Sequence, residues 1–234
     1  CGDCHDDVSL EASIHTDFLC ADCHSNVPER HPREAIEPMS VDETCSGCHR
    51  KTIRELDQSV HAGKASCTDC HGEPHDVRAS ASVDSRMSSV NQITNCGQCH
   101  DEPEGLIDGY LTSVHGRGLL KAGLANSASC SDCHGVHGIL PVDSAAAPTA
   151  HAHSPEMCGD CHSLLLETWK TDSAHGLAWV AGDEAAPVCT DCHSSHDIIR
   201  PTSDTNRLQS AETCGDCHEY HLKTFRNSFH GKAN

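Results

Sequence analysis

Apolar residues in this chain come in short clusters that are separated by polar segments. Ile53, Leu56 and Val60 recur at helical intervals, which predicts a helix within residues 45–61. Two further clusters predict short helices over residues 158–170 and 214–226. The pattern shows little sign of paired β-strands. We therefore expect a mostly irregular fold with short α-helices and very little β-structure.

The segments between these clusters are rich in Ser, Asp, Ala and Pro and lack hydrophobic periodicity. Residues 79–91 and 141–155 are examples, and both are predicted to be surface loops. No apolar run approaches the roughly 18–20 residues that a membrane-spanning helix needs. The sequence therefore predicts no membrane span.

Composition leaves few side chains for an ordinary protein core. Only 3% of the 234 residues are aromatic, and the 36% that are hydrophobic include 18 cysteines. Mean hydropathy is −0.48. A chain of this length normally buries a core of aliphatic and aromatic side chains. Something other than protein, such as metal or a large organic cofactor, or else a set of disulfides, must stabilise the interior.

All the cysteines belong to one motif, C-x-x-C-H, which occurs nine times. This spacing is the attachment signature of c-type haem, in which two thiols bond covalently to one porphyrin. The chain is therefore predicted to carry nine haem c groups. The predicted covalent attachment sites are Cys1, Cys4, Cys20, Cys23, Cys45, Cys48, Cys67, Cys70, Cys96, Cys99, Cys130, Cys133, Cys158, Cys161, Cys189, Cys192, Cys214 and Cys217.

Two other uses of paired cysteines fit the pattern less well. A disulfide framework does not require a histidine after every pair. Zinc ribbons use C-x-x-C pairs, but a second such pair normally completes the site, and a trailing histidine has no purpose there. The histidine of each motif is instead placed to ligate haem iron. These proximal ligands are His5, His24, His49, His71, His100, His134, His162, His193 and His218.

The motifs alternate between two kinds and so define a repeat of two haems. The first kind is followed 10 to 15 residues later by Ser-x-His, and the second kind has Asp before its second cysteine and a further histidine nearby. We predict one elongated array without separate domains, built from four full repeats and a half repeat. The approximate boundaries are 1–40, 41–91, 92–153, 154–209 and 210–234.

The repeat also supplies one further histidine for each iron. The predicted distal ligands are His15, His31, His61, His75, His115, His137, His175, His196 and His230. Among these, His31 has an irregular spacing. His151, His153 and His221 are left over, and any of them could replace an assigned ligand.

Chain length restricts which iron each distal histidine can reach. Two imidazoles on opposite faces of one iron place their Cα atoms on the order of 12 Å apart. His134 and His137 are three residues apart, which spans at most roughly 10 Å. A helix of twelve residues, about 18 Å long, would separate His49 from His61. Distal histidines are therefore expected to ligate neighbouring haems.

The alternation of C-x-x-C-H, Ser-x-His and C-x-D-C-H-x-x-H resembles the multihaem c-type cytochromes with doubled haem motifs. That group includes the pentahaem donor to periplasmic nitrite reductase, the decahaem conduits of outer-membrane porins and extracellular filament cytochromes. The resemblance implies low-potential bis-histidine haems and long-range electron transfer.

Three kinds of function stay open. An electron-transfer protein suits full bis-histidine coordination, because no iron then binds substrate. A multihaem oxidoreductase of the nitrite-reductase or hydroxylamine-oxidase type needs one open haem. Such an enzyme is disfavoured, and no catalytic residue is assigned. The third kind is a subunit of a haem-filled extracellular nanowire filament, which could also transfer electrons.

Compartment and charge restrict the partners. Thioether attachment of haem is completed outside the cytoplasm, so we expect a periplasmic or extracellular protein whose signal peptide has been removed. The formal charge is −19, and nine ferric haems bring it to about −28. This charge disfavours nucleic acid as a partner. Redox proteins, extracellular acceptors or further copies of the chain are the expected partners.

Overall fold

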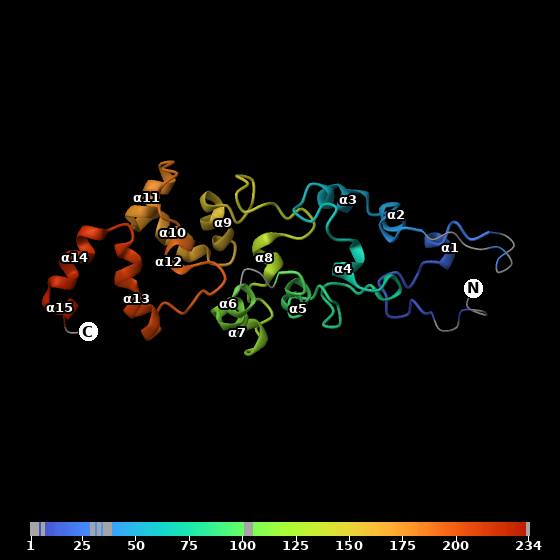
Figure 1. Ribbon diagram of the computed structural model, residues 1–234, viewed down its shortest axis with the longest axis horizontal. Helices are drawn as coiled ribbons and strands as arrows, with labels where there is room; N and C mark the ends of the chain where they lie inside the picture. The colour runs from blue at the N-terminus through green and yellow to red at the C-terminus, as the bar shows by residue number, and fades with distance from the viewer. Residues whose placement is uncertain are drawn as a thin grey trace. The chain divides into compact units, whose positions relative to one another are not determined.

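The computed structural model describes residue 5, residues 8–28, residues 31 and 34, and residues 39–100 and 105–232. Short helices joined by irregular segments make up this part of the chain, and it contains no strand (Figure 1). The prediction of short α-helices with very little β-structure is confirmed. None of the helices described is long and apolar enough to cross a membrane.

The chain divides into two compact units, each made of two segments. Unit 1 comprises Cys1–Asp101 and Ala128–Pro148, and unit 2 comprises Glu102–Ser127 and Thr149–Asn234. The helices of unit 1 are α1 (Cys20–Cys23), α2 (Val41–Ser46), α3 (Arg50–Asp57), α4 (Cys67–His71), η1 (Pro74–Asp76), α5 (Gln92–Gly97) and α8 (Cys130–His134). Those of unit 2 are α6 (Leu106–Thr112), α7 (Val114–Leu120), η2 (His151–His153), α9 (Ser154–Gly159), α10 (Ser163–Asp172), α11 (Ala174–Val180), α12 (Cys189–His193), α13 (Asp204–Gly215), α14 (Glu219–Asn227) and α15 (Phe229–Lys232).

Motifs of the first kind interrupt helices rather than lie within them. The predicted continuous helices over residues 45–61, 158–170 and 214–226 are wrong in this respect, because each is broken inside its motif. The motif histidines His49, His162 and His218 have ψ angles of 42°, 45° and 51°, outside the helical range, and each is the N-cap of the next helix. The break separates the histidine from the helix that carries the first cysteine.

Motifs of the second kind form helices themselves, and their aspartate explains why. Asp69 Oδ2 accepts a hydrogen bond of 2.7 Å from the backbone N–H of Ser66, at the N-cap of α4. Asp132 in α8 and Asp191 in α12 accept the equivalent bonds, of 2.7 and 2.6 Å. A carboxylate in the first turn satisfies a backbone donor that the helix leaves unpaired. The aspartate therefore stabilises the short helix that presents both cysteines.

The serine of each Ser-x-His segment organises the backbone around the histidine. Ser113 Oγ donates to the carbonyl oxygen of Tyr110 at 2.7 Å and accepts from the N–H of Gly116 at 3.0 Å. Ser113 is almost fully buried and is the N-cap of α7. A side chain at Gly116 would collide with the Tyr110 carbonyl. The same serine-to-glycine hydrogen bond is made at Ser173 and Ser228.

Successive repeats are joined by one recurring backbone hydrogen bond within each unit. In unit 1 the N–H of Ile14 donates to the carbonyl of Val77, and the N–H of Val60 donates to that of Ile139, both at 2.8 Å. In unit 2 the N–H of Val114 donates to the carbonyl of Ile198, also at 2.8 Å. Each bond links the residue before a Ser-x-His histidine to a residue in the next repeat. The repeats are therefore connected in one fixed register.

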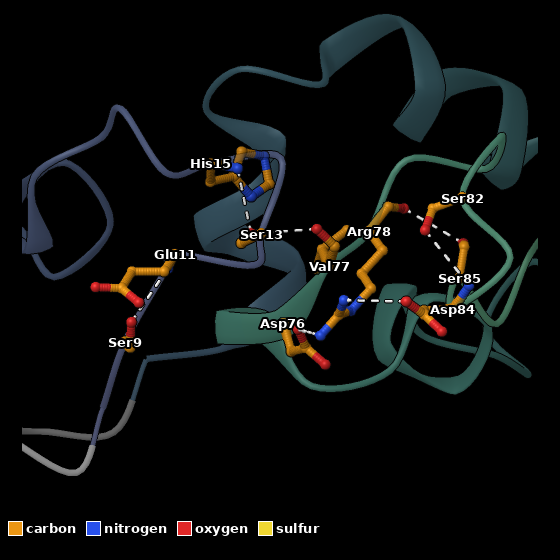
Figure 2. A network of polar contacts seen from close by, with 10 residues as sticks. All are labelled: Ser9, Glu11, Ser13, His15, Asp76, Val77, Arg78, Ser82, Asp84 and Ser85. Atoms are coloured by element: carbon orange, nitrogen blue, oxygen red, sulfur yellow. Dashed lines mark hydrogen bonds and ion pairs between the residues drawn. The ribbon is translucent and has the colours of Figure 1, made fainter.

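Figure 2 shows this junction between the first two repeats. Ser13 Oγ donates to the Val77 carbonyl and accepts from the N–H of His15, both at 3.2 Å. Beside it, Arg78 pairs with Asp76 at 2.8 Å and with Asp84 at 3.6 Å. The loop that begins at Ala79 is thus held against the junction.

The buried apolar set is small. In the part of the chain that the structure describes, the buried hydrophobic residues are Ile93, Leu119, Ala147, Ala150, Ala186 and Val188. Large apolar side chains are instead exposed at many positions, such as Leu164 and Phe229, which are 78% and 82% exposed. Protein side chains alone do not form the core of this molecule.

Candidate functional site

Seven histidine pairs are the main feature of the candidate site. Each pair joins a motif histidine to a histidine predicted to be a distal ligand. With their centroid separations, the pairs are His5–His31 (6.2 Å), His49–His15 (6.2 Å), His24–His75 (5.9 Å), His100–His61 (5.9 Å), His71–His137 (6.0 Å), His162–His115 (6.2 Å) and His218–His175 (6.0 Å).

This spacing fits haem iron held between two imidazoles. Each iron–nitrogen bond is about 2 Å, and a ring nitrogen lies about 1 Å from its centroid, so the two centroids should be about 6 Å apart. The described residues contain no group of three or more His, Cys, Asp or Glu that could hold a bare metal ion. Donors that come in pairs suit a porphyrin, which supplies the other four ligands.

The pairs follow one rule along the repeats. Each Ser-x-His histidine faces the first motif of the following repeat, as His61 faces His100 and His175 faces His218. The histidine near a second motif faces the second motif of the preceding repeat, as His75 faces His24 and His137 faces His71. The sequence predicted that each distal histidine ligates a neighbouring haem, but it did not identify which histidines pair with each other.

His31 departs from the rule because it faces His5 within its own repeat. Its irregular spacing in the sequence marks the same exception. His221 also lies 5.9 Å from His218, but the two are three residues apart at the start of α14. Three residues are too few to place imidazoles on opposite faces of one iron. His175 is therefore the better partner for His218.

Burial favours the neutral form of several of these imidazoles, which is the form that binds metal. It lowers the pKa of His61, His71 and His115, and the imidazole opposite each of them lowers it further. A lowered pKa favours neutral imidazole, which is the ligating form.

Cysteines of consecutive motifs lie next to one another inside each unit. Within single repeats, thiol hydrogen bonds join Cys45 to Cys67, Cys96 to Cys130 and Cys158 to Cys189. Between repeats, Cys70 lies close to Cys96 and Cys99, and Cys192 lies close to Cys214 and Cys217.

The structure joins none of its described cysteines in a disulfide. Porphyrins attached to neighbouring cysteines must themselves be neighbours, since a thioether places the porphyrin edge directly at the sulfur. Haems held by these motifs would therefore lie side by side within each unit.

The remaining predicted residues have different settings. His134 ends α8, and His196 follows α12 in an irregular segment. His193 ends α12 and is exposed, and His230 lies in α15 with its ring against Phe229. Neither His193 nor His230 faces a second imidazole within unit 2, where all histidines are described. Cys1 and Cys4 lie outside the described residues.

One comparison with known proteins supports this assignment. Residues 54–135 match the family described as cytochrome c7 and related cytochrome c. The match covers about a third of the chain and includes the motifs that begin at Cys67, Cys96 and Cys130. This part of the chain is thus similar to a family of multihaem c-type cytochromes, which indicates covalently bound haem. Neither the curated proteins nor the solved structures yielded a significant match.

Proposed function

We propose that this protein transfers electrons over long range through nine covalently bound c-type haems. The observation that carries the proposal is the set of seven imidazole pairs at 5.9–6.2 Å. An iron with two imidazole ligands has no position left for substrate, whereas its porphyrin edge can still exchange electrons. Haem supplies the one-electron chemistry, and the chain holds the haems in sequence.

The ligation rule supports a continuous path for electrons. Except for His31, which faces His5 in its own repeat, each paired distal histidine comes from an adjacent repeat, so these haem sites are completed only by a neighbouring repeat. The thiol contact between Cys45 and Cys67 and the proximity of Cys70 to Cys96 support close approach of three consecutive haems. The most direct use of such an array is conduction along it.

The remaining site residues of the proposal come from the motif pattern alone. Cys1 and Cys4 complete the first attachment site, and His134 and His196 are proposed as a proximal and a distal ligand. His230 has the position of a distal ligand in the repeat. Its role depends on what its exposed ring meets in the assembled protein.

We place the protein in the periplasm or outside the cell. Haem is attached through thioethers outside the cytoplasm, and the similarity to cytochrome c7 over residues 54–135 supports the same setting. Its negative charge favours basic or cation-bridged redox partners, whose association should weaken as salt rises. Light scattering and electron micrographs of the purified protein distinguish a soluble carrier from a filament subunit.

The proposal is tested by haem content and redox behaviour together. Intact mass should show nine haems on each chain, and a redox titration should show nine electrons taken up at low potential. In the variant His61→Ala, the haem attached at Cys96 and Cys99 should become high-spin and electron passage should slow. Leu177→Ala, at an exposed residue of α11, is the control and should leave both properties unchanged. Fewer than nine haems, or haems that exchange no electrons, would contradict the proposal.

A further inference from the structure

The histidine pairs differ in the angle between the planes of their two rings. Four of them take their distal histidine from a Ser-x-His segment, and these four fall into two groups. The pairs of His15 and His61, in unit 1, have interplanar angles of 65° and 73°. The pairs of His115 and His175, in unit 2, have angles of 32° and 19°. One kind of segment therefore delivers its imidazole in two orientations, near-perpendicular and near-parallel to the opposite ring.

Two of these segments have the same sequence, which narrows the cause. Residues 59–61 and 113–115 are both Ser-Val-His. In each segment the serine Oγ donates to the carbonyl three residues earlier at 2.7 Å. In each, the valine N–H donates to a carbonyl of the next repeat at 2.8 Å. The two segments make the same contacts up to the histidine, so the difference arises after it.

The chain that follows the histidine is different in the two segments. Gly116 follows His115, and its N–H donates to the serine Oγ at 3.0 Å, so that the serine caps α7. Ala62 follows His61, and here the N–H of the histidine itself donates to the serine Oγ at 3.0 Å. A bond of 3.2 Å from the N–H of Ala62 to the serine carbonyl closes a turn in place of a helix.

The other two segments follow the same division. Gly176 follows His175, and its N–H donates to the Oγ of the serine that caps α11, at 3.3 Å. Thr16 follows His15, whose own N–H donates to Ser13 Oγ at 3.2 Å (Figure 2). In all four segments, glycine accompanies near-parallel rings and a residue with a Cβ accompanies near-perpendicular rings.

Steric contact explains why the helix needs glycine. A Cβ at Gly116 would collide with the Tyr110 carbonyl, and one at Gly176 would collide with the Trp169 carbonyl. Thr16 and Ala62 carry this Cβ, and their segments form turns instead. The histidine thus lies in the first turn of a helix in one group and in a non-helical turn in the other, which changes the direction of its Cα–Cβ bond and the plane of its ring.

Ring orientation matters because each imidazole donates π electrons to one d orbital of ferric iron. Parallel rings raise the same d orbital, which separates it from its partner and stabilises the ferric state. Perpendicular rings raise both orbitals equally, so the two stay close in energy and the ferric state is stabilised less. Axial ligands are one of the means by which a protein tunes haem.

We propose that the residue after each Ser-x-His histidine is a positioning residue that sets the angle between the two axial imidazoles, and with it the electronic class and reduction potential of the haem. Thr16 and Ala62 give near-perpendicular haems of higher potential. Gly116 and Gly176 give near-parallel haems of lower potential. The inference rests on the proposed function because it needs the haems to be bound between these pairs.

The test is electron paramagnetic resonance of the fully oxidised protein, after intact mass has shown nine haems. Near-perpendicular imidazoles give a low-spin signal of large g anisotropy, and near-parallel imidazoles give a rhombic signal with three resolved features. Ala62→Gly should move the haem attached at Cys96 and Cys99 from the first signal to the second and lower its potential in a spectroelectrochemical titration. Gly116→Ala should move the haem attached at Cys158 and Cys161 in the opposite direction.

The matched control is Gly138→Ala, which adds the same methyl group directly after the distal histidine His137. A Cβ there meets nothing closer than Glu55 Cβ at 3.8 Å, so the spectrum should not change. In His61→Ala the large-anisotropy signal should lose the contribution of one haem, and adding Ala62→Gly should remove no more. A further loss would contradict the assignment.

The outcomes separate orientation from ligation. An unchanged spectrum in Ala62→Gly would overturn the orienting role, and a changed spectrum with an unchanged potential would overturn the tuning role. A high-spin haem in Gly116→Ala would show that the glycine delivers the ligand rather than orients it, which also overturns the proposal. Should Gly116→Ala fail to fold, Ala62→Gly still decides the question. Failure of the proposed function would appear earlier, in haem content and redox titration of the wild type.

Discussion

Helices α4 and α12 have the same five residues, Cys-Thr-Asp-Cys-His, yet they sit in different surroundings. In α4, His71 is half-buried and faces His137 at 6.0 Å, and Gly72 follows it. In α12, His193 is exposed and faces no imidazole of its unit, and Ser194 follows it. The pentapeptide forms the same capped helix in both places. The second iron ligand therefore depends on another repeat, not on the motif.

The largest change in stability is expected from Gly72→Ala in α4. Gly72 has φ 82° and ψ −154°, and a side chain there would approach Arg86 Cδ to 2.8 Å. The backbone conformation alone should cost about 1–3 kcal/mol of folding free energy. Thermal unfolding of the holoprotein measures the loss. Gly63→Ala is a control for positive φ in open space, and it should cost less because nothing lies within 4 Å.

The reverse change at α12 should stabilise the protein. Ser194→Gly removes a side chain from a conformation suited to glycine, which should add about 1 kcal/mol of folding free energy. The gain appears as a raised unfolding temperature. An unchanged or lowered temperature would show that Ser194 is not strained.

The positive charge of Arg86 lies beside α4, and its effect on the haem of that motif is the next difference to test. Its side chain lies over Gly72 and acts electrostatically on Asp69 and Cys70. Arg86→Gln should lower the reduction potential of the haem attached at Cys67 and Cys70, because a nearby cation stabilises the added electron. Spectroelectrochemical titration should resolve this shift. Arg54→Gln, on an exposed part of α3, is the control and should leave that potential unchanged.

The smallest effect is expected at His151, whose side chain contacts α12 through Asp191. His151 and Asp191 form a contact of 2.9 Å, with both side chains more than 40% exposed. An exposed pair of this kind contributes less than about 1 kcal/mol, so His151→Ala should barely change thermal unfolding. Asp191 should still cap α12 through the N–H of Val188. Loss of haem from Cys189 and Cys192 in this variant would mean that the contact positions the motif.

The sequence by itself predicted the features that depend on local chemistry. Covalent attachment of haem needs two thiols and a histidine within five residues, so each motif indicates its own site. The scarcity of aromatic residues predicted a small protein core, and the buried apolar set in the described residues is small. Short helices were predicted correctly as a class because their apolar spacing is local.

Helix boundaries were predicted less well because the backbone of the motif histidine decides them. Residues 158–170 have a helical spacing of apolar residues, but His162 has ψ 45° and separates α9 from α10. Hydrophobic periodicity carries no information about this single dihedral angle. The serine of the segment that carries His115 was likewise recognised only as part of a pattern, and Gly116 was not singled out. The structure explains the glycine on steric grounds, since a side chain at Gly116 would collide with the Tyr110 carbonyl.

Only the tertiary structure decided which histidines face each other. The chain contains enough histidines to place two on every iron, but this number does not distinguish between the many possible pairings. The backbone bonds from Ile14 to Val77 and from Val60 to Ile139 set the register between repeats. That register places His15 opposite His49 and His61 opposite His100. Proximity between residues far apart in the chain results from packing, which no local motif encodes.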